Sequence, residues 1–339
     1  MYNVGLFSGS FNPLHLGHVS CFIQVANMCK ECHIVISNGI GRSEIDIRQK
    51  FRWVYQCTKH LNNVHLHILD DDTATKDAYT AEYWETDAQK VKIMLGKPID
   101  VVFFGNDYNG ETFYTKCYPE CEQVRISRNE MNSTLIRSNP YKFWDWLPSV
   151  VRPYYVKKVL LVGGESVGKS TLAINLSLHF NTNYIEEAGK HLSEKSGTDK
   201  LMLPEDFTEI LLKHKLSELE ALQNSNRVIF EDTDCQITKF YLNFLEQESD
   251  QKHKNQILAD AISGINSYDL VLFLEPDVEF ARDGNRNKEI EENRIKFSEQ
   301  IKEILNENGI SYFCITGTYQ QRFIRAKELV TQILTQVNV

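Results

Sequence analysis

The sequence has no long apolar stretch. None of its 339 residues falls in a run of about 18 apolar side chains, so a membrane-spanning helix is not expected. The segment MYNVGLFSGS lacks a basic region followed by a long apolar core, which argues against a secretory signal. Repeats and low-complexity segments are absent as well. We therefore expect a globular protein in the cytoplasm.

Excess positive charge is also absent. The 37 Lys and Arg residues are outnumbered by 46 Asp and Glu residues, which gives a formal net charge of −9. Proteins that bind nucleic acid neutralise backbone phosphates with clustered Lys and Arg. The sequence therefore predicts no nucleic-acid partner, while a local basic pocket for a small anion is compatible with it.

Eight cysteines are present, and a chain without an export signal is expected to keep them as thiols. Cys29, Cys32 and His33 form the CxxCH pattern of haem attachment, which requires an exported chain. Cys117 and Cys121 form a CxxxC pair, and a zinc site built from both pairs stays open. Because CxxxC is a loose spacing, ordinary buried or surface thiols are the favoured interpretation.

The first half of the chain alternates short apolar runs with amphipathic segments. Strands are expected at 4–7, 33–37, 64–69, 100–105 and 123–127. Helices are expected at 18–30, 45–60 and 79–95, with a further helix opening at Ser133. This alternation is typical of βαβ units and predicts a Rossmann-like α/β domain with a parallel sheet over residues 1–146.

A segment with two prolines, LPSVVRPYYVKK at 147–158, interrupts this alternation, which then restarts. We expect a linker at 147–156 and a second parallel α/β domain at 157–339. Its strands are expected at 157–164, 183–187, 227–232, 269–275 and 310–316, and its helices at 169–180, 205–223 and 319–337. Five leucines are predicted to lie on the apolar side of the 205–223 helix: Leu211, Leu212, Leu216, Leu219 and Leu222.

The stretch FSGSFNPLHLGHVS at 7–20 places glycines, a proline and two histidines between the first strand and the first helix. A glycine turn that feeds a helix exposes backbone N–H groups, and the helix dipole favours an anion there. His15 and His18 can donate ring N–H bonds to phosphate oxygens at the helix start. The pattern HLGH also occurs in ordinary loops, so the two interpretations must be separated by other motifs.

A second motif, MNSTLIR at 131–137, separates them. Arg137 is permanently charged and forked, so it can reach triphosphate oxygens, while Ser133 or Thr134 can cap a helix. GSFNPLHLGH and MNSTLIR resemble the nucleotidyltransferase superfamily, whose motifs are (H/T)xGH and ISxTxxR, with Met131 and Asn132 in place of Ile-Ser. The resemblance implies nucleotidyl transfer from ATP or CTP, with catalytic roles for His15, His18 and Arg137. Nucleotide contacts are expected from Gly9, Ser10, Phe11, Asn12, Ser133 and Thr134.

The stretch VGGESVGKST at 162–171 follows an apolar strand and precedes a helix, and it has the GxxxxGKS form of a P-loop. In such a loop, backbone N–H groups surround the β-phosphate, Lys169 reaches the β- and γ-phosphates, and Ser170 binds Mg²⁺. The motif therefore predicts binding of a nucleoside triphosphate with Mg²⁺. The predicted nucleotide-binding residues are Gly163, Gly164, Glu165, Ser166, Val167, Gly168, Lys169, Ser170 and Thr171.

Acidic residues follow two predicted strands of the second domain. VIFEDTD at 228–234 makes Asp232 the candidate Mg²⁺ ligand, with Asp234 nearby. Glu186 and Glu187 end the strand at 183–187, and Glu187 is the candidate for orienting or deprotonating a substrate hydroxyl. Acidic residues at strand ends also cap helices, so capping is an equally good interpretation of each one.

The polar segment RDGNR at 282–286 is predicted to form a lid that brings Arg286 to the transferring phosphate. A P-loop with such a lid and no further apparatus is typical of a small-molecule kinase.

The whole chain resembles the NadR family of bifunctional NMN adenylyltransferases and ribosylnicotinamide kinases. The resemblance rests on GGESVGKST, the DTD strand end, the pattern Asp283-Gly284-x-Arg286, FGNDYNG at 104–110 and NPYKFWDWLP at 139–148. It implies ATP, Mg²⁺, nicotinamide riboside and NMN as ligands and NAD as product. With such ligands, Phe280, just before the lid, can stack against a nicotinamide ring. The DNA-binding module in front of some members is not expected here, and a homo-oligomer is compatible with the sequence.

Two alternative functions stay open. Coenzyme A synthase also couples an adenylyltransferase to a P-loop kinase, but GGES and the DGxR pattern favour nicotinamide substrates. A non-catalytic nucleotide sensor is an alternative from another class. Intact His15, His18, Lys169 and Ser170 argue against it, because a sensor needs only to bind.

Overall fold

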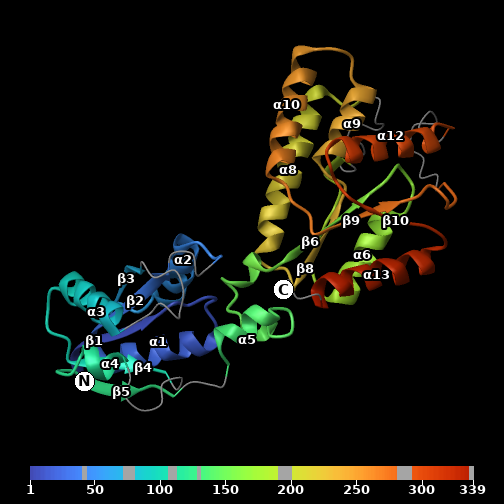
Figure 1. The fold of residues 1–339 in the computed structure, drawn as a ribbon. Helices are drawn as coiled ribbons and strands as arrows, with labels where there is room; N and C mark the ends of the chain where they lie inside the picture. The colour runs from blue at the N-terminus through green and yellow to red at the C-terminus, as the bar shows by residue number, and fades with distance from the viewer. Residues whose placement is uncertain are drawn as a thin grey trace. The chain divides into compact units, whose positions relative to one another are not determined.

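The structure is a computed structural model and describes residues 1–39, 44–71, 81–105, 113–127, 131–189, 201–280 and 292–335. The chain divides into two compact units, Met1–Val151 and Arg152–Val339, and each is described by itself (Figure 1). The division lies inside the segment predicted as a linker. The activity expected of each domain stays a prediction.

The first unit is a parallel α/β layer structure. Its described strands are β1 (Tyr2–Gly9), β2 (Cys29–Gly39), β3 (Val64–Asp71), β4 (Val101–Phe104) and β5 (Glu122–Arg125), in the order β3-β2-β1-β4-β5. Its described helices are α1 (Leu16–Met28), α2 (Ile47–Thr58), α3 (Ala81–Leu95), α4 (Phe113–Cys117) and α5 (Ser133–Ser138), followed by the 3₁₀ helix η2 (Trp144–Trp146). The chain passes from one side of β1 to the other, and ligands bind at the carboxyl edge of such a switch point.

The second unit repeats this plan. Its described strands are β6 (Lys157–Val162), β7 (Tyr184–Ile185), β8 (Val228–Asp232), β9 (Leu270–Leu274) and β10 (Phe313–Ile315), all parallel, in the order β10-β9-β6-β8-β7. Its described helices are α6 (Lys169–Phe180), α8 (Pro204–Leu222), α9 (Cys235–Leu245), α10 (Asp250–Ile265), α12 (Arg294–Glu307) and α13 (Tyr319–Thr335), and the 3₁₀ helix η3 (Arg152–Tyr154) precedes β6. The predicted two-domain α/β class with parallel sheets is confirmed.

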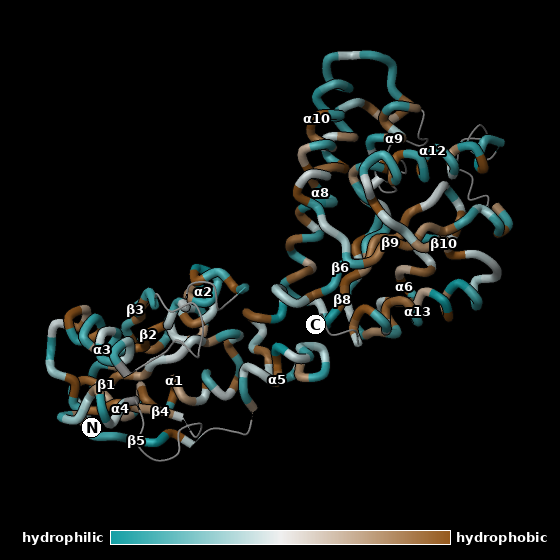
Figure 2. Tube along the Cα trace, in the orientation of Figure 1, coloured by the Kyte–Doolittle hydropathy of each residue, from teal (hydrophilic) through white to brown (hydrophobic). Residues whose placement is uncertain are grey.

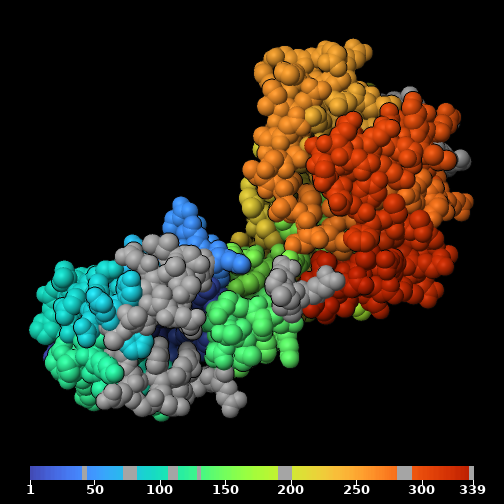
Figure 3. Space-filling model, in the orientation of Figure 1, coloured from blue at the N-terminus to red at the C-terminus, as the bar shows by residue number. Residues whose placement is uncertain are grey.

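The core of the second unit lies on both faces of its sheet. Because successive strand residues point to opposite faces, Val159 and Leu161 pack with α6 and α13, while Leu160 and Val162 pack with α9 and α12. Figure 2 shows these strands as apolar segments among more polar helices. In the space-filling view, α12 and α13 (red) form much of the visible surface of this unit (Figure 3). The central strand β6 is thus covered on both faces, and its carboxyl end carries the P-loop.

The apolar side of α8 differs from the prediction. Phe207, Ile210 and Leu211 are buried, whereas Leu212, Leu216 and Leu219 are 48%, 58% and 50% exposed and Leu222 is half-buried. The buried side continues with a charged residue, since Glu218 is 2% exposed and forms ion pairs of 2.9 Å with Lys158 and 2.6 Å with Lys215. The prediction is confirmed for Leu211 and wrong for Leu212, Leu216 and Leu219, because a paired charge occupies part of the buried face.

The cysteines are free thiols in the described structure. Cys29 and Cys32 lie within β2, and burial raises the pKa of Cys29 to about 11 and that of Cys32 to about 12. Among the described residues, no group of three or more His, Cys, Asp or Glu side chains could hold a metal ion. In the same part of the chain, no helix is both long and apolar enough to cross a membrane.

Candidate active sites

The turn after β1 brings the first histidine pair to the amino end of α1. His15 is the N-cap of α1, and its Nδ1 accepts a hydrogen bond of 3.1 Å from the backbone N–H of Gly17. The His18 Nδ1 accepts one of 3.3 Å from the backbone N–H of His15, and the two rings stack with centroids 3.7 Å apart. A Cβ on Gly17 would lie 2.9 Å from the His15 ring, so this packing requires glycine.

These contacts fix where each imidazole carries its proton. A backbone N–H can only donate, so the Nδ1 of His15 and that of His18 must be acceptors. The neutral form of each ring therefore carries its proton on Nε2. Both Nε2 atoms can donate a hydrogen bond to a phosphate oxygen, as the sequence predicted for the side chains.

The residues from the end of β1 to His15 differ in their burial and packing. Gly9 ends β1 and Ser10 is exposed, whereas Phe11 is 1% exposed and packs against Phe7, Phe22 and His18. The Phe11 side chain is therefore part of the core, and its predicted nucleotide contact stays a prediction. The Asn12 side chain is 9% exposed, and its Oδ1 has no hydrogen-bond partner within the described residues.

The second motif lies against the first. Arg137 donates from Nη1 to the backbone oxygen of Asn12 and from Nη2 to Thr134 Oγ1 at 3.1 Å, while Ser133 Oγ donates to Pro13 O at 3.0 Å. The structure therefore brings MNSTLIR against the Asn12-Pro13 turn that leads into HLGH. The predicted cap is corrected: Asn132, not Ser133 or Thr134, caps α5, because its Oδ1 accepts from Leu135 N at 2.9 Å. The Asn that departs from the superfamily motif thus performs the capping itself.

The P-loop surrounds the start of α6. Gly163 has φ +147°, and a Cβ there would lie 2.6 Å from the backbone oxygen of Leu274, so glycine is required. Gly164, Glu165 and Ser166 continue the loop, and the Val167 side chain is buried in the core. Lys169 is 8% exposed, and its Nζ donates to Gly163 O at 3.2 Å and to Gly164 O at 3.0 Å. These bonds hold the ammonium group over the loop, while Thr171 is exposed.

Ser170 and Asp232 meet at the carboxyl end of the sheet. Ser170 Oγ donates to Asp232 Oδ2 at 2.5 Å, and Asp232 is fully buried at the end of β8. Burial raises the pKa of Asp232, and the nearby Lys169 ammonium opposes that rise. A hydroxyl and a buried carboxylate at this spacing are hard oxygen donors and fit Mg²⁺.

Asp234 occupies a different position from Asp232. Its Oδ1 accepts from Gln236 N at 3.0 Å and from Ile237 N at 3.2 Å, which makes it the N-cap of α9. Burial raises its pKa to about 6. The structure thus gives Asp234 the capping role that was the alternative interpretation, and its predicted nucleotide contact stays a prediction.

The remaining candidates lie around the same edge. Glu186 and Glu187 follow β7, and Glu186 is near enough to Asp232 to raise the pKa of that carboxyl. The Arg294 guanidinium lies over the Phe280 ring, with its carbon 5.6 Å from the ring centroid. The predicted stacking of Phe280 on nicotinamide stays a prediction. Arg286 and the whole RDGNR segment lie outside the described residues, as do residues 106–110 of FGNDYNG.

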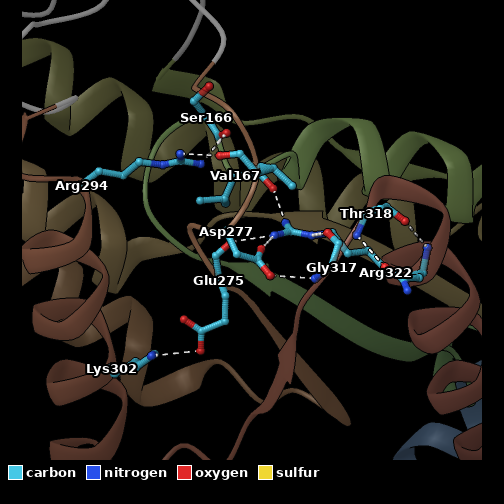
Figure 4. A network of polar contacts seen from close by, with 11 residues as sticks. Ser166, Val167, Glu275, Asp277, Arg294, Lys302, Gly317, Thr318 and Arg322 are labelled. Atoms are coloured by element: carbon cyan, nitrogen blue, oxygen red, sulfur yellow. Dashed lines mark hydrogen bonds and ion pairs between the residues drawn. The ribbon is translucent and has the colours of Figure 1, made fainter.

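Sequence reasoning missed two arginines, Arg294 and Arg322, that contact the P-loop backbone (Figure 4). Arg322 lies on the buried side of α13, with Ala326, Leu329 and Val330. A charged residue at an apolar position of an amphipathic helix was the signal that could have identified it. Arg294 gives no comparable signal.

Comparisons with known proteins cover both units. A family model described as an AAA domain matches residues 158–322. The trifunctional NAD biosynthesis/regulator protein NadR of Salmonella typhimurium (strain LT2) is 26% identical, over 98% of this chain and 83% of its own length. The chain is a homologue of NadR. The resemblance to that family, which the motifs indicated, is therefore confirmed.

Solved NadR structures share this fold. A crystal structure of NadR protein in complex with NR has a TM-score of 0.79 at 21% identity, covering 98% of this chain and 96% of that chain. One in complex with NAD and AMP-PNP has the same TM-score at 20% identity, covering 100% and 98%. The similarity in fold to these NadR structures thus extends over both units.

Proposed function

We propose that the chain is a bifunctional transferase of NAD synthesis. Its second unit phosphorylates nicotinamide riboside with ATP to give NMN, and its first unit transfers an adenylyl group from ATP to NMN, giving NAD and pyrophosphate. The observation that carries this proposal is a glycine turn at the carboxyl end of the central strand of each sheet, in a homologue of NadR. Two phosphate sites in one chain suit two successive ATP-dependent steps.

The kinase step needs positioning and charge stabilisation. The hydroxyl oxygen of the riboside attacks the γ-phosphorus, the bond from that phosphorus to the bridging oxygen breaks, and ADP leaves. Lys169 stabilises the charge that develops on the β- and γ-phosphates. Glu187 is proposed to accept the hydroxyl proton, and Arg286 to contact the transferring group.

Mg²⁺ would be held by Ser170 and Asp232, and it would neutralise charge on the nucleotide phosphates. The 2.5 Å contact between their oxygens supports the fit. Asp232 is buried, so a cation there would favour its charged form.

The adenylyl step uses the histidine turn. A phosphate oxygen of NMN attacks the α-phosphorus of ATP, the bond to the bridging oxygen of the β-phosphate breaks, and pyrophosphate leaves. The Nε2–H groups of His15 and His18 donate to phosphate oxygens as charge develops. Arg137 adds a fixed positive charge beside Asn12 and Thr134.

Glu187→Gln is expected to lower the kinase kcat by about 10²-fold or more, because an amide cannot accept the hydroxyl proton. Glu186→Gln is the matched control, since it changes the neighbouring residue in the same way. Steady-state riboside phosphorylation would be measured for both variants. An unchanged rate for Glu187→Gln assigns it a binding or structural role, and a loss confined to Glu186→Gln transfers the base to Glu186.

One coupled assay tests the proposed function. Purified chain with MgATP would receive nicotinamide riboside, NMN or phosphopantetheine in turn, and the products would be separated by chromatography. NMN and NAD are expected from the first two substrates. Turnover of phosphopantetheine alone would support the coenzyme A alternative, and no turnover at all would support a sensor. We propose the cytoplasm as the compartment and small molecules rather than nucleic acid as partners.

A further inference from the structure

Two arginines hold neighbouring carbonyl groups of the P-loop. Arg294, the first residue of α12, donates from Nη2 to the backbone oxygen of Ser166 at 3.0 Å. Arg322, on α13, donates from Nη1 to the backbone oxygen of Val167 at 2.6 Å. Figure 4 shows the two guanidinium groups reaching the loop from different helices. Two successive peptide groups are therefore fixed from outside the loop.

Fixing a carbonyl also fixes the N–H of the same peptide group. In a trans peptide the C=O and the N–H point in opposite directions. With the Ser166 and Val167 carbonyls turned to the arginines, the N–H groups of Val167 and Gly168 face the other way. Successive N–H groups turned to one side form an anion-binding concavity, as a P-loop requires. Ser166 has φ +56°, a strained conformation for a serine that these contacts help to hold.

Arg322 is itself firmly anchored. It is 1% exposed and donates to Glu275 O at 2.7 Å and to Gly317 O at 2.9 Å, and it forms an ion pair with Asp277. Asp277 also accepts from the Gly317 N–H at 2.7 Å. The guanidinium thus joins the P-loop to the segment after β9 and to the turn before α13. A lysine has a single amino group and cannot make this set of contacts.

Arg294 joins the loop to a second segment. Its Nη1 donates to Val278 O at 2.6 Å, and its guanidinium lies over the Phe280 ring. Arg294 therefore joins the P-loop to the segment after β9 that includes Val278. The same side chain lines a cavity of about 520 Å³ with Pro276 and residues 292–296.

We propose that Arg294 and Arg322 are positioning residues that orient the Val167 and Gly168 N–H groups for binding the ATP phosphates. This inference rests on the proposed kinase function. Neither arginine needs to touch the nucleotide. Each arginine holds a backbone carbonyl group, and the N–H of the same peptide group contacts the nucleotide.

Conservative variants test the orientation. Arg322→Lys and Arg294→Lys keep the positive charge but lose the several N–H donors of the guanidinium group. Each is expected to raise the kinase KM for ATP about 10- to 100-fold, because one preorganised phosphate contact loosens. The KM for the riboside should stay within twofold of wild type. Arg325→Lys is the matched control, since Arg325 lies on α13 at 51% side-chain exposure and pairs with Glu328. Thermal unfolding of the second unit in the same samples checks that it is intact.

Chemical rescue separates orientation from general damage. Arg294→Ala opens onto the cavity, so added guanidinium ion should restore the KM for ATP, whereas urea at the same concentration should not. Equal losses in both substrate KM values, or rescue by urea as good as by guanidinium, would overturn the proposal. So would a KM for ATP within twofold of wild type in both lysine variants.

The failure of the proposed function has a different outcome. A wild-type chain that phosphorylates no riboside contradicts the kinase proposal itself. Binding of AMP-PNP would then be measured in the His18→Ala background, with and without Arg322→Lys. Weaker binding in the Arg322→Lys protein would keep the positioning role, and equal binding would remove it.

Discussion

Lys169→Ala is expected to abolish phosphorylation of nicotinamide riboside while NMN adenylylation by the same chain persists. The substitution removes the cation proposed to meet the β- and γ-phosphates, and a loss of about 10²–10³-fold is the scale for one preorganised phosphate contact. It also removes the bonds from Nζ to Gly163 O and Gly164 O. Asp232 loses a neighbouring positive charge that lowers its pKa, so its charged form becomes less favourable.

Two further variants test whether the charge of Lys169 is the cause of this expected loss. Lys169→Met keeps most of the side chain's length without the charge, so it should be as inactive as Lys169→Ala if the ammonium is what matters. Lys213→Ala removes an exposed lysine of α8 that pairs with Glu209, and it should leave both reactions unchanged. Chromatography of the products would follow both activities in one sample. A folded Lys169→Ala protein that has lost both reactions would contradict the model of two independent ATP sites.

The parts of the site that sequence predicts best are those set by neighbours along the chain. The P-loop and the HLGH turn each lie between a strand and a helix, so glycine, cap and histidine positions are local properties. The start of α6 at Lys169 agrees with the expected boundary for this reason. The alternation of strands and helices likewise predicts parallel sheets without any knowledge of long-range contacts.

The parts of the site that the sequence does not predict depend on contacts between residues far apart in the chain. Arg322 contacts Val167 across 155 positions of the chain. Its place on the apolar side of α13 marks it as unusual, but nothing near either residue identifies the other as its partner. Capping shows a second limit, because two carboxylates, one at the end of β8 and one two residues later, lie close to the start of α9. Asp234 takes the cap and Asp232 meets Ser170, a division that only the three-dimensional path of the chain decides.

Burial on α8 shows a third limit. Hydrophobic periodicity assigns the inner face to leucines, yet Glu218 is buried there between Lys158 and Lys215. Such a pairing requires one lysine from β6 and another from α8 itself, and a single-helix pattern cannot reveal it.

His18→Ala is expected to give the reverse of Lys169→Ala: the riboside is phosphorylated, and NMN accumulates without becoming NAD. The proposed donor to phosphate is Nε2–H, and its removal should cost about 10²–10³-fold in adenylylation. The same substitution removes the Nδ1 acceptor for the His15 N–H, a cap contact worth about 0.5–2 kcal/mol of stability. Thermal unfolding of the first unit would therefore be measured beside the two reactions.

A matched pair of variants separates the two nitrogens of His18. In His18→Asn the side-chain oxygen can take the place of Nδ1, so the cap contact is kept while the donor is lost. In His18→Gln the terminal amide can reach the place of Nε2, so a donor is kept while the cap contact is lost. We expect His18→Asn to be as inactive in NMN adenylylation as His18→Ala, and His18→Gln to retain a measurable part of it. His60→Ala, on an exposed histidine of the same unit, is the control. An active His18→Asn protein beside an inactive His18→Gln protein would mean that His18 acts through the helix cap and not on phosphate.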